Sequence, residues 1–150
     1  MRWIDRDKLP HDVPHWIDPS QEAFFITINC RQRSLNQLAY PDVWQGIRDA
    51  IEFREQRGDW KWPIFLAMPD HFHGIVTFPK TFYLRKNIRE WKRWTARNHR
   101  IHWQEGFFDH RLRSGENASS TADYIRQNPV RAGLATLPEE WPYRRDWRDA

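Results

Sequence analysis

Residues 61–78 read KWPIFLAMPDHFHGIVTF. This stretch holds two short apolar runs, Lys61–Met68 and His71–Phe78, and only Pro69-Asp70 separates them. A proline followed by an aspartate is typical of a tight turn, and apolar runs on both sides of a turn favour paired strands. We therefore expect an antiparallel hairpin, and it is the most informative part of the chain.

The residues before the hairpin predict one strand and one helix. Ala23–Cys30 is short and rich in aromatic and β-branched residues, which is typical of a buried strand. Arg31–Ala39 is expected to be a polar loop. From Pro41 onward apolar residues recur at helical spacing, so we expect a helix that begins at this proline and ends before Gly58.

A strongly basic helix is expected after the hairpin, between Tyr83 and Arg100. Leu84 and Ile88 begin its apolar face. The other positions carry seven cations: Arg85, Lys86, Arg89, Lys92, Arg93, Arg97 and Arg100. Only Glu90 offsets them. Together with 24 Lys and Arg against 20 Asp and Glu in the whole chain, this helix indicates a polyanionic partner.

The last third of the chain predicts one more strand and one more helix. Trp103–Arg113 has aromatic residues on both sides of a glycine and is expected to be a strand with a bend at Gly106. A final helix is expected to run up to Asn128, where Pro129 ends it, because the residue before a proline is pushed out of the helical region. Two serines are candidates for its N-cap, Ser114 and Ser120.

The chain is expected to form a single domain, residues 1–150, of the α+β class. Its length suits one core, and its aromatic content of 15% supplies the bulk to fill it. The order of the expected elements is strand, helix, strand, strand, helix, strand, helix. This order implies one antiparallel β-sheet covered by α-helices.

Several function classes are excluded by the composition. The six glycines lie too far apart for a dinucleotide or ATP loop, and no serine stands in the G-x-S-x-G setting of serine hydrolases. The only cysteine, Cys30, excludes disulfides and zinc sites with two thiolates. Because there is also no signal peptide and no run of 18 apolar residues, a cytoplasmic location is expected.

Two histidines of the second hairpin strand are candidate metal ligands. In a strand, His71 and His73 project from the same face with Cα atoms about 6.5 to 7 Å apart, so both imidazoles can reach one cation. Phe72 points the other way and is expected to anchor the strand in the core. The alternative is a pair of histidines that simply faces solvent on a half-exposed strand.

Tyr124 and Asn128 are four residues apart, so on a helix a phenol and a carboxamide share one face. This pairing places a hydroxyl close to an oxygen that can bind a metal. The alternative is that Tyr124 is an ordinary core aromatic and that Asn128 caps the helix before Pro129. Spacing alone leaves both interpretations open.

Two stretches resemble one known family, the HUH single-tyrosine transposases: Met68-Pro-Asp-His-Phe-His-Gly-Ile-Val76 and Tyr124-Ile-Arg-Gln-Asn-Pro-Val-Arg-Ala-Gly-Leu134. Trp103-Gln-Glu-Gly-Phe-Phe-Asp-His-Arg-Leu-Arg113 is similar to the branch of that family associated with bacterial repetitive extragenic palindromes, or REP elements, and Trp141-Pro-Tyr143 fits its tail. The chain departs from the family pattern at Asp70 and Gly74, where asparagine and leucine are more usual.

The resemblance implies a ferredoxin-like or RRM-like HUH endonuclease core. It also implies that His71, His73 and Asn128 bind a divalent metal, Mg²⁺ or Mn²⁺, and that Tyr124 is the nucleophile. The expected reaction nicks and rejoins single-stranded REP-type hairpin DNA through a 5′-phosphotyrosine intermediate. His110 is a further candidate, either for supporting a metal ligand through a hydrogen bond or for giving a proton to the leaving oxygen.

Substrate binding is expected from the basic helix and from arginines near the motifs. These candidates are Arg85, Lys86, Arg89, Lys92, Arg93, Arg97, Arg111, Arg113, Arg126 and Arg131. Some of Trp60, Trp62, Trp91, Trp94 and Trp103 could stack on unpaired bases, although each ring is better explained by the core. Phosphate contacts or a plain surface position are expected for His99 and His102.

Two other functions stay open on the sequence. One is a module that binds hairpin DNA or RNA without cutting it, and the other is a metal-dependent hydrolase in which water attacks. The chain is expected to be a monomer or a homodimer.

Overall fold

The computed structural model describes residues 22–78, 83–113 and 115–149. The strands are β1 Glu22–Asn29, β2 Lys61–Ala67, β3 His71–Phe78, β4 Phe108–Leu112 and β5 Arg144–Asp146. The helices are α1 Pro41–Gln56, α2 Leu84–His99 and α3 Gly115–Arg131, with short 3₁₀ turns at Pro138–Glu140 and Trp147–Asp149. In these ranges no helix is both long and apolar enough to cross a bilayer.

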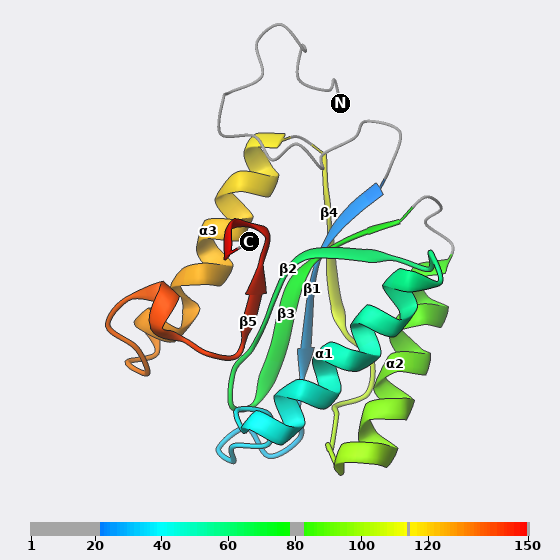
Figure 1. Cartoon of the computed structure of the whole chain (residues 1–150), viewed down its shortest axis with the longest axis horizontal. Coiled ribbons are helices and arrows are strands. Elements are labelled where there is room, and N and C mark those ends of the chain that lie inside the picture. Colours follow the sequence, from blue (N-terminus) through cyan, green and yellow to red (C-terminus); the bar gives the residue numbers. More distant parts are fainter. Residues whose placement is uncertain (1–21, 79–82, 114, 150) are drawn as a thin grey trace, which may run out of the picture.

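The strands form one antiparallel sheet in the order β4-β1-β3-β2-β5. Helices α1 and α2 cover one face, and α3 covers part of the other (Figure 1). The expected α+β architecture and the β2–β3 hairpin are therefore confirmed. Strand β5 was not expected from the sequence, because it is only three residues long.

Period-two alternation in the strands divides the interior into two cores. The core under α1 and α2 is aromatic and includes Phe24, Trp62, Phe65, Phe72 and Trp91. The core under α3 is mostly aliphatic and includes Ile64, Leu66, Ile75, Ala118, Ala122 and Ile125, with Trp141 as its one aromatic member among the buried residues described. Phe72 is fully buried in the first core, as predicted, so the flanking His71 and His73 lie on the α3 face.

Gly74 is explained by the packing of β3 against β2. A Cβ at this position would lie 2.5 Å from the carbonyl oxygen of Ile64 and 2.8 Å from the Cβ of Phe65. Phe65 is the register partner of Gly74 and is buried in the aromatic core. The leucine that is more usual in the family would collide with this neighbour. The position of Phe65 therefore requires a glycine at residue 74.

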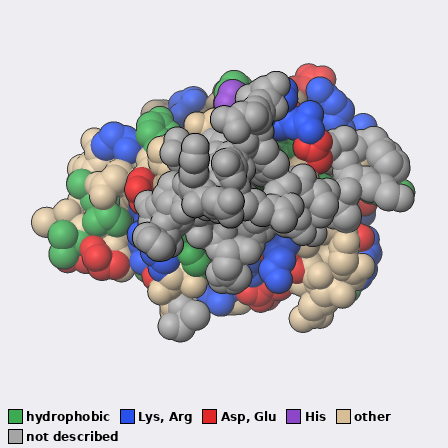
Figure 2. Space-filling model, turned by 90° about the horizontal axis from the view of Figure 1, so that it is seen from above, with side chains coloured by type: hydrophobic (Ala, Val, Ile, Leu, Met, Phe, Trp, Pro, Cys, Tyr) green, Lys and Arg blue, Asp and Glu red, His purple; other side chains and the backbone are tan. Residues whose placement is uncertain are grey.

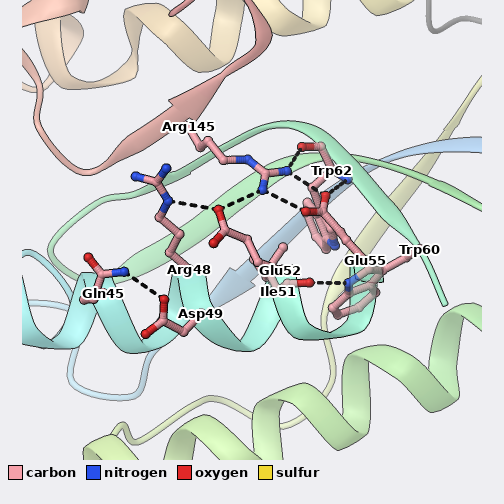
Figure 3. A network of polar contacts seen from close by, with 9 residues as sticks. All are labelled: Gln45, Arg48, Asp49, Ile51, Glu52, Glu55, Trp60, Trp62 and Arg145. Atoms are coloured by element: carbon pink, nitrogen blue, oxygen red, sulfur yellow. Dashed lines mark hydrogen bonds and ion pairs between the residues drawn. The ribbon is translucent and has the colours of Figure 1, made fainter. Parts of the chain in front are cut away.

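A partly buried ion pair joins β5 to α1. The Arg145 guanidinium donates to both carboxylate oxygens of Glu55, at 2.8 and 2.6 Å, and to the carbonyl oxygen of Trp62 at 2.6 Å (Figure 3). The bidentate geometry is the strong form of an arginine–carboxylate pair. It fixes the short edge strand, whose backbone alone offers few hydrogen bonds.

The expectation that Pro129 ends the last helix is wrong. Helix α3 contains Pro129 and continues to Arg131. A proline removes only one N–H from the helical ladder, and the chain closes the helix after it instead: Gly133 has a φ of +75°, and the Leu134 N–H donates to the carbonyl oxygen of Pro129 at 2.8 Å. Asn128 is consequently a residue of the helix and not its cap.

Two smaller expectations also need correction. Ser120 lies inside α3, where its hydroxyl donates to the carbonyl oxygen of Asn117, so it is not an N-cap; Ser114 lies outside the described residues. The predicted strand 103–113 is shorter, because Trp103 forms only an isolated bridge with Cys30 and β4 begins at Phe108. The bend at Gly106 is confirmed by its φ of +76°.

Candidate active site

Three of the predicted site residues meet on the α3 face of the sheet. The Asn128 carboxamide lies 3.1 Å from His71 Nε2 and 3.0 Å from His73 Nε2, measured from its Nδ2 atom. The two imidazole rings are 5.2 Å apart between centroids. Strand β3 therefore supplies two nitrogens and α3 supplies an amide, and all three point to one place.

The small side chains of α3 make this meeting possible. Ala118 and Ala122 are completely buried against the sheet, in the same core as Ile75. Small residues let a helix lie close to the sheet, so the carboxamide of Asn128, farther along the same helix, reaches the strand. The solvent-facing alternative for the histidine pair is wrong, because His73 is only 2% exposed.

The surroundings keep both imidazoles neutral. Burial, together with the charges of His71 and Arg131, lowers the pKa of His73 to about 3. Burial also lowers the pKa of His71, against the opposing effect of Asp70. Neutral imidazoles have a free lone pair, which is the form that binds a metal.

Asp70 fixes which nitrogen of His71 carries that lone pair. Its Oδ1 atom lies 2.9 Å from His71 Nδ1, and its Oδ2 atom accepts a hydrogen bond from Arg33 Nε at 3.1 Å. Although burial raises the pKa of Asp70, these two hydrogen bonds lower it, so the carboxylate is ionised. An ionised acceptor places the imidazole proton on Nδ1 and leaves Nε2 free to face Asn128.

The chemistry of this donor set fits a divalent cation. A half-turn of the Asn128 carboxamide exchanges Nδ2 for Oδ1, which would set two imidazole nitrogens and one amide oxygen around a common point. None of these three donors is charged, so a cation bound there would keep its full charge. Over the described ranges, no cluster of three or more His, Cys, Asp and Glu side chains forms a metal site; this set differs because its third donor is an amide.

Tyr124 lies at the surface next to this set. Its side chain is 55% exposed, so the core alternative for this residue is wrong. The ring of Phe25 contacts both Tyr124, at 6.3 Å between centroids, and His73, at 6.1 Å. The guanidinium of Arg131 lies 4.1 Å from the centre of the Tyr124 ring and donates to the Tyr124 carbonyl oxygen. The phenol is thus open to a substrate, and a cation lies on its face.

The basic helix α2 lies on the opposite face of the sheet from this site (Figure 1). Five of its predicted DNA-binding residues are exposed: Arg85, Lys86, Arg89, Arg93 and Arg97. Lys92 is committed to the fold, because its Nζ donates to the carbonyl oxygens of Gln104 and Gly106 at 2.8 and 2.6 Å. These two bonds hold the segment that leads into β4, so α2 adjoins the β4 edge of the sheet.

The remaining arginine candidates differ in their availability. Arg113 is exposed, and Arg111, on β4, is paired with Glu22. Arg126 is a correction, because it is buried and paired with Asp146 and Asp123, which leaves it no role at the surface. On the face that Figure 2 presents, both Lys and Arg and Asp and Glu side chains are visible around the atoms drawn in grey, in keeping with the modest net charge of +4.

The aromatic and histidine candidates fall into two groups. The indoles of Trp60, Trp62, Trp91 and Trp103 are core residues, whereas Trp94 is 44% exposed. His99 packs against Gly46 of α1, and His102 and His110 are exposed.

Sequence reasoning missed the roles of Asp70 and Phe25. In the sequence Asp70 stands out only as a departure from the family pattern, although a carboxylate directly before a candidate ligand is itself a signal of support. Phe25 belongs to a strand in which every second residue faces α3, so its face was predictable but its contacts with Tyr124 and His73 were not.

The chain is similar to known proteins in sequence and in fold. No family model matches the chain. A REP-associated tyrosine transposase of Escherichia coli K12 is 29% identical over 132 residues, which cover 85% of this chain and 78% of the relative. A Haemophilus influenzae protein with the same family designation is 24% identical over 143 residues, covering 84% and 80%.

Solved structures give the same result. A REP-associated tyrosine transposase bound to a REP hairpin superposes with a TM-score of 0.74 at 25% identity, over 94% of this chain and 85% of that one. A transposase-like protein of Deinococcus radiodurans, at 12% identity and a TM-score of 0.53, shares the fold; the match covers 76% of this chain and 94% of that protein. In the order of its motifs, in sequence and in fold, the chain is therefore similar to REP-associated tyrosine transposases.

Proposed function

We propose that this protein is a metal-dependent transposase that nicks and rejoins single-stranded REP-type hairpin DNA, with Tyr124 as the nucleophile. The observation that carries the proposal is the meeting of His71, His73 and Asn128 at one point beside an exposed tyrosine. The relatives named tyrosine transposases, and the one bound to a REP hairpin, support the substrate class.

His71, His73 and Asn128 are the residues that would hold Mg²⁺ or Mn²⁺. When bound, the cation would offset the negative charge of the scissile phosphate and align it for in-line attack. Asp70 keeps His71 in the tautomer that presents Nε2. The apolar ring of Phe25, packed on His73, keeps water from one side of the site.

Tyr124 would form the covalent link. Its phenolic oxygen attacks phosphorus, the bond from phosphorus to the 3′ oxygen breaks, and the products are a 5′-phosphotyrosine and a 3′-hydroxyl. Phenols ionise near pH 10, so a base must take the phenolic proton as the new bond forms, and the leaving oxygen must gain one. A second 3′-hydroxyl can reverse the step and rejoin DNA without ATP.

The hairpin would be held by phosphate contacts along α2. At the β4 edge of the sheet, Lys92 of this helix ties the segment that leads into β4 to α2. A strand that passes around this edge moves from the α2 face to the α3 face. This route would connect a stem on the basic helix with a single-stranded extension at Tyr124.

The test is capture of the covalent intermediate. Wild-type protein is incubated with Mn²⁺ and a hairpin oligonucleotide that carries a single-stranded extension and a 3′ label, and the products are separated under denaturing conditions. We expect a labelled protein band, because the 5′-phosphotyrosine retains the 3′ fragment. Tyr124→Phe is expected to lose this band while it still binds the oligonucleotide. His71→Ala is expected to lose the band, and added Mn²⁺ should not restore it.

Each of the other outcomes would indicate a different mechanism or function for this protein. A labelled band with Tyr124→Phe would mean that another residue is the nucleophile. Binding by the wild type without any cleavage would favour a regulatory module that only holds the hairpin. Cleavage that survives in Tyr124→Phe but not in His71→Ala would indicate a hydrolase that uses water.

A further inference from the structure

No described residue covers the part of the α3 face of the sheet beside Tyr124, and aromatic rings line it. Strand β4 is an edge strand, and four of its five residues are exposed. Phe108 is 56% exposed, although a phenylalanine side chain prefers burial. Its ring contacts Phe25 edge to face, with centroids 6.3 Å apart.

The sheet register explains why Phe108 stands in the open. Phe108 and His110 pair with Thr27 and Phe25 of β1, so their side chains lie on the α3 face. The next residue on that face, Leu112, is buried in the core under α3. Helix α3 thus covers one end of β4 and leaves Phe108 and His110 outside.

Phe25 connects this open surface to the candidate nucleophile. One edge-to-face contact joins Phe25 to Phe108 and another joins it to Tyr124, both at 6.3 Å. A DNA strand whose phosphate lies at the Tyr124 hydroxyl must place an adjacent nucleotide over the neighbouring protein surface. On the β4 side, that surface is Phe108.

We propose that Phe108, supported by Phe25, is the stacking site for an unpaired base next to the scissile phosphate. This inference rests on the proposed function, and it names the part of the substrate that the open surface takes. Exposed aromatic rings suit bases of any sequence, because every base has a π-face, and stacking of this kind is worth roughly 5- to 150-fold in affinity. Arg131, which lies over the Tyr124 ring, adds positive charge beside a strand that is negative.

A fluorescent base analogue tests the stacking directly and without cleavage. In a series of hairpin oligonucleotides, 2-aminopurine replaces each base of the single-stranded extension in turn. With wild-type protein we expect one position, or two adjacent ones, to change fluorescence strongly on binding. In Phe108→Ala this change should disappear and affinity for the extension should fall about tenfold, whereas Phe108→Trp should retain both.

Phe53→Ala is the matched control. Phe53 is 57% exposed, on α1 at the opposite face of the sheet, so its loss should leave the fluorescence pattern and affinity unchanged. An abasic residue at the responsive position should weaken the wild type about as much as Phe108→Ala does, and it should not weaken the variant further. Two results would overturn the proposal. One is an unchanged fluorescence pattern in Phe108→Ala. The other is a loss of affinity from Phe108→Ala that is as large on abasic DNA as on intact DNA.

The outcome is separable from that of the proposed function. Tyr124→Phe should abolish the covalent band and leave the fluorescence change in place, since the base stacks on Phe108 and not on the phenol. If the fluorescence change depends on Phe108 but the wild type never forms the covalent band, the stacking site is supported and the proposed nicking activity is contradicted.

Discussion

The two faces of the sheet carry different kinds of side chain. The face under α1 and α2 is filled by large aromatic rings in mutual contact, such as Trp62, Phe72 and Trp91. The face under α3 has a smaller core and holds His71 and His73, with part of its surface open. We expect the first face to contribute most of the stability, because the second carries polar and exposed groups.

The strongest test of this division uses two neighbours on β3. Phe72→Ala should destabilise the protein by about 4 kcal/mol, because it leaves a cavity in the aromatic core. His71→Ala, one residue away on the other face, should cost only about 1 kcal/mol, the worth of a typical hydrogen bond. Chemical denaturation of both variants measures the difference in the free energy of unfolding. Equal losses would show that the two faces contribute equally to stability.

A second test concerns the buried pair that anchors the end of the chain to α3. Arg126 donates to Asp146, and both are buried. Asp146→Asn should destabilise the protein by about 3 kcal/mol at neutral pH, because it leaves the arginine without its counter-charge. The result is read from the free energy of unfolding, with Asp149→Asn as the control, since the ion pair of Asp149 with Arg144 is exposed at the aspartate.

Acidic pH should break the ion pair between Arg126 and Asp146 by protonating the carboxylate. Burial raises the pKa of Asp146, but the hydrogen bonds and charge of Arg126 outweigh it, so the pKa in the folded protein lies below its ordinary value near 3.8. The stabilisation is therefore complete above that value and is lost as the pH falls through the lower pKa of the folded state. Melting temperatures at several pH values should fall more steeply below pH 4 for the wild type than for Asp146→Asn.

Much of the aromatic face was predictable from sequence, and less of the α3 face. Apolar residues at helical spacing located α1 and α2, and two apolar runs on either side of Pro69-Asp70 located the β2–β3 hairpin. The end of α3 was missed because the rule for proline describes a preference of the preceding residue, and at Asn128 the surrounding structure overrides it. Strand β5 was missed because its place depends on Arg145 finding Glu55, a contact between residues far apart in the chain.

The candidate site shows the same limit. Alternation placed the two histidines on one face, and helical spacing placed Tyr124 with Asn128, but only the packing of α3 brings the two pairs together. The fate of each cation was also beyond the sequence. Arg126 and Arg93 are both arginines in amphipathic helices, yet one is buried against an aspartate and the other is exposed.

A smaller effect is expected at the support of the metal-ligand candidate. Asp70→Asn keeps a hydrogen-bond acceptor for His71 Nδ1 but removes the negative charge, so Mn²⁺ affinity should fall about tenfold. Titration calorimetry with Mn²⁺ measures the change, and Asp109→Asn, an exposed aspartate on β4, is the control. Identical affinities for Asp70→Asn and the wild type would mean that Asp70 serves only the turn.

The smallest effect separates two adjacent cations on α2. Arg93 is exposed, whereas Lys92 spends its hydrogen bonds on the carbonyl oxygens of Gln104 and Gly106. If Arg93 contacts one phosphate, Arg93→Ala should lower the slope of log affinity against log salt by about 1, a few-fold change in affinity at moderate salt. Lys92→Met should leave that slope unchanged and instead lower the melting temperature, because the segment before β4 loses its attachment. Salt titrations of hairpin binding distinguish the two, and a reduced slope for Lys92→Met with none for Arg93→Ala would reverse the assignment of these residues. The comparison matters for the whole surface, since a charge that holds the backbone and a charge that holds DNA are indistinguishable in a count of basic residues.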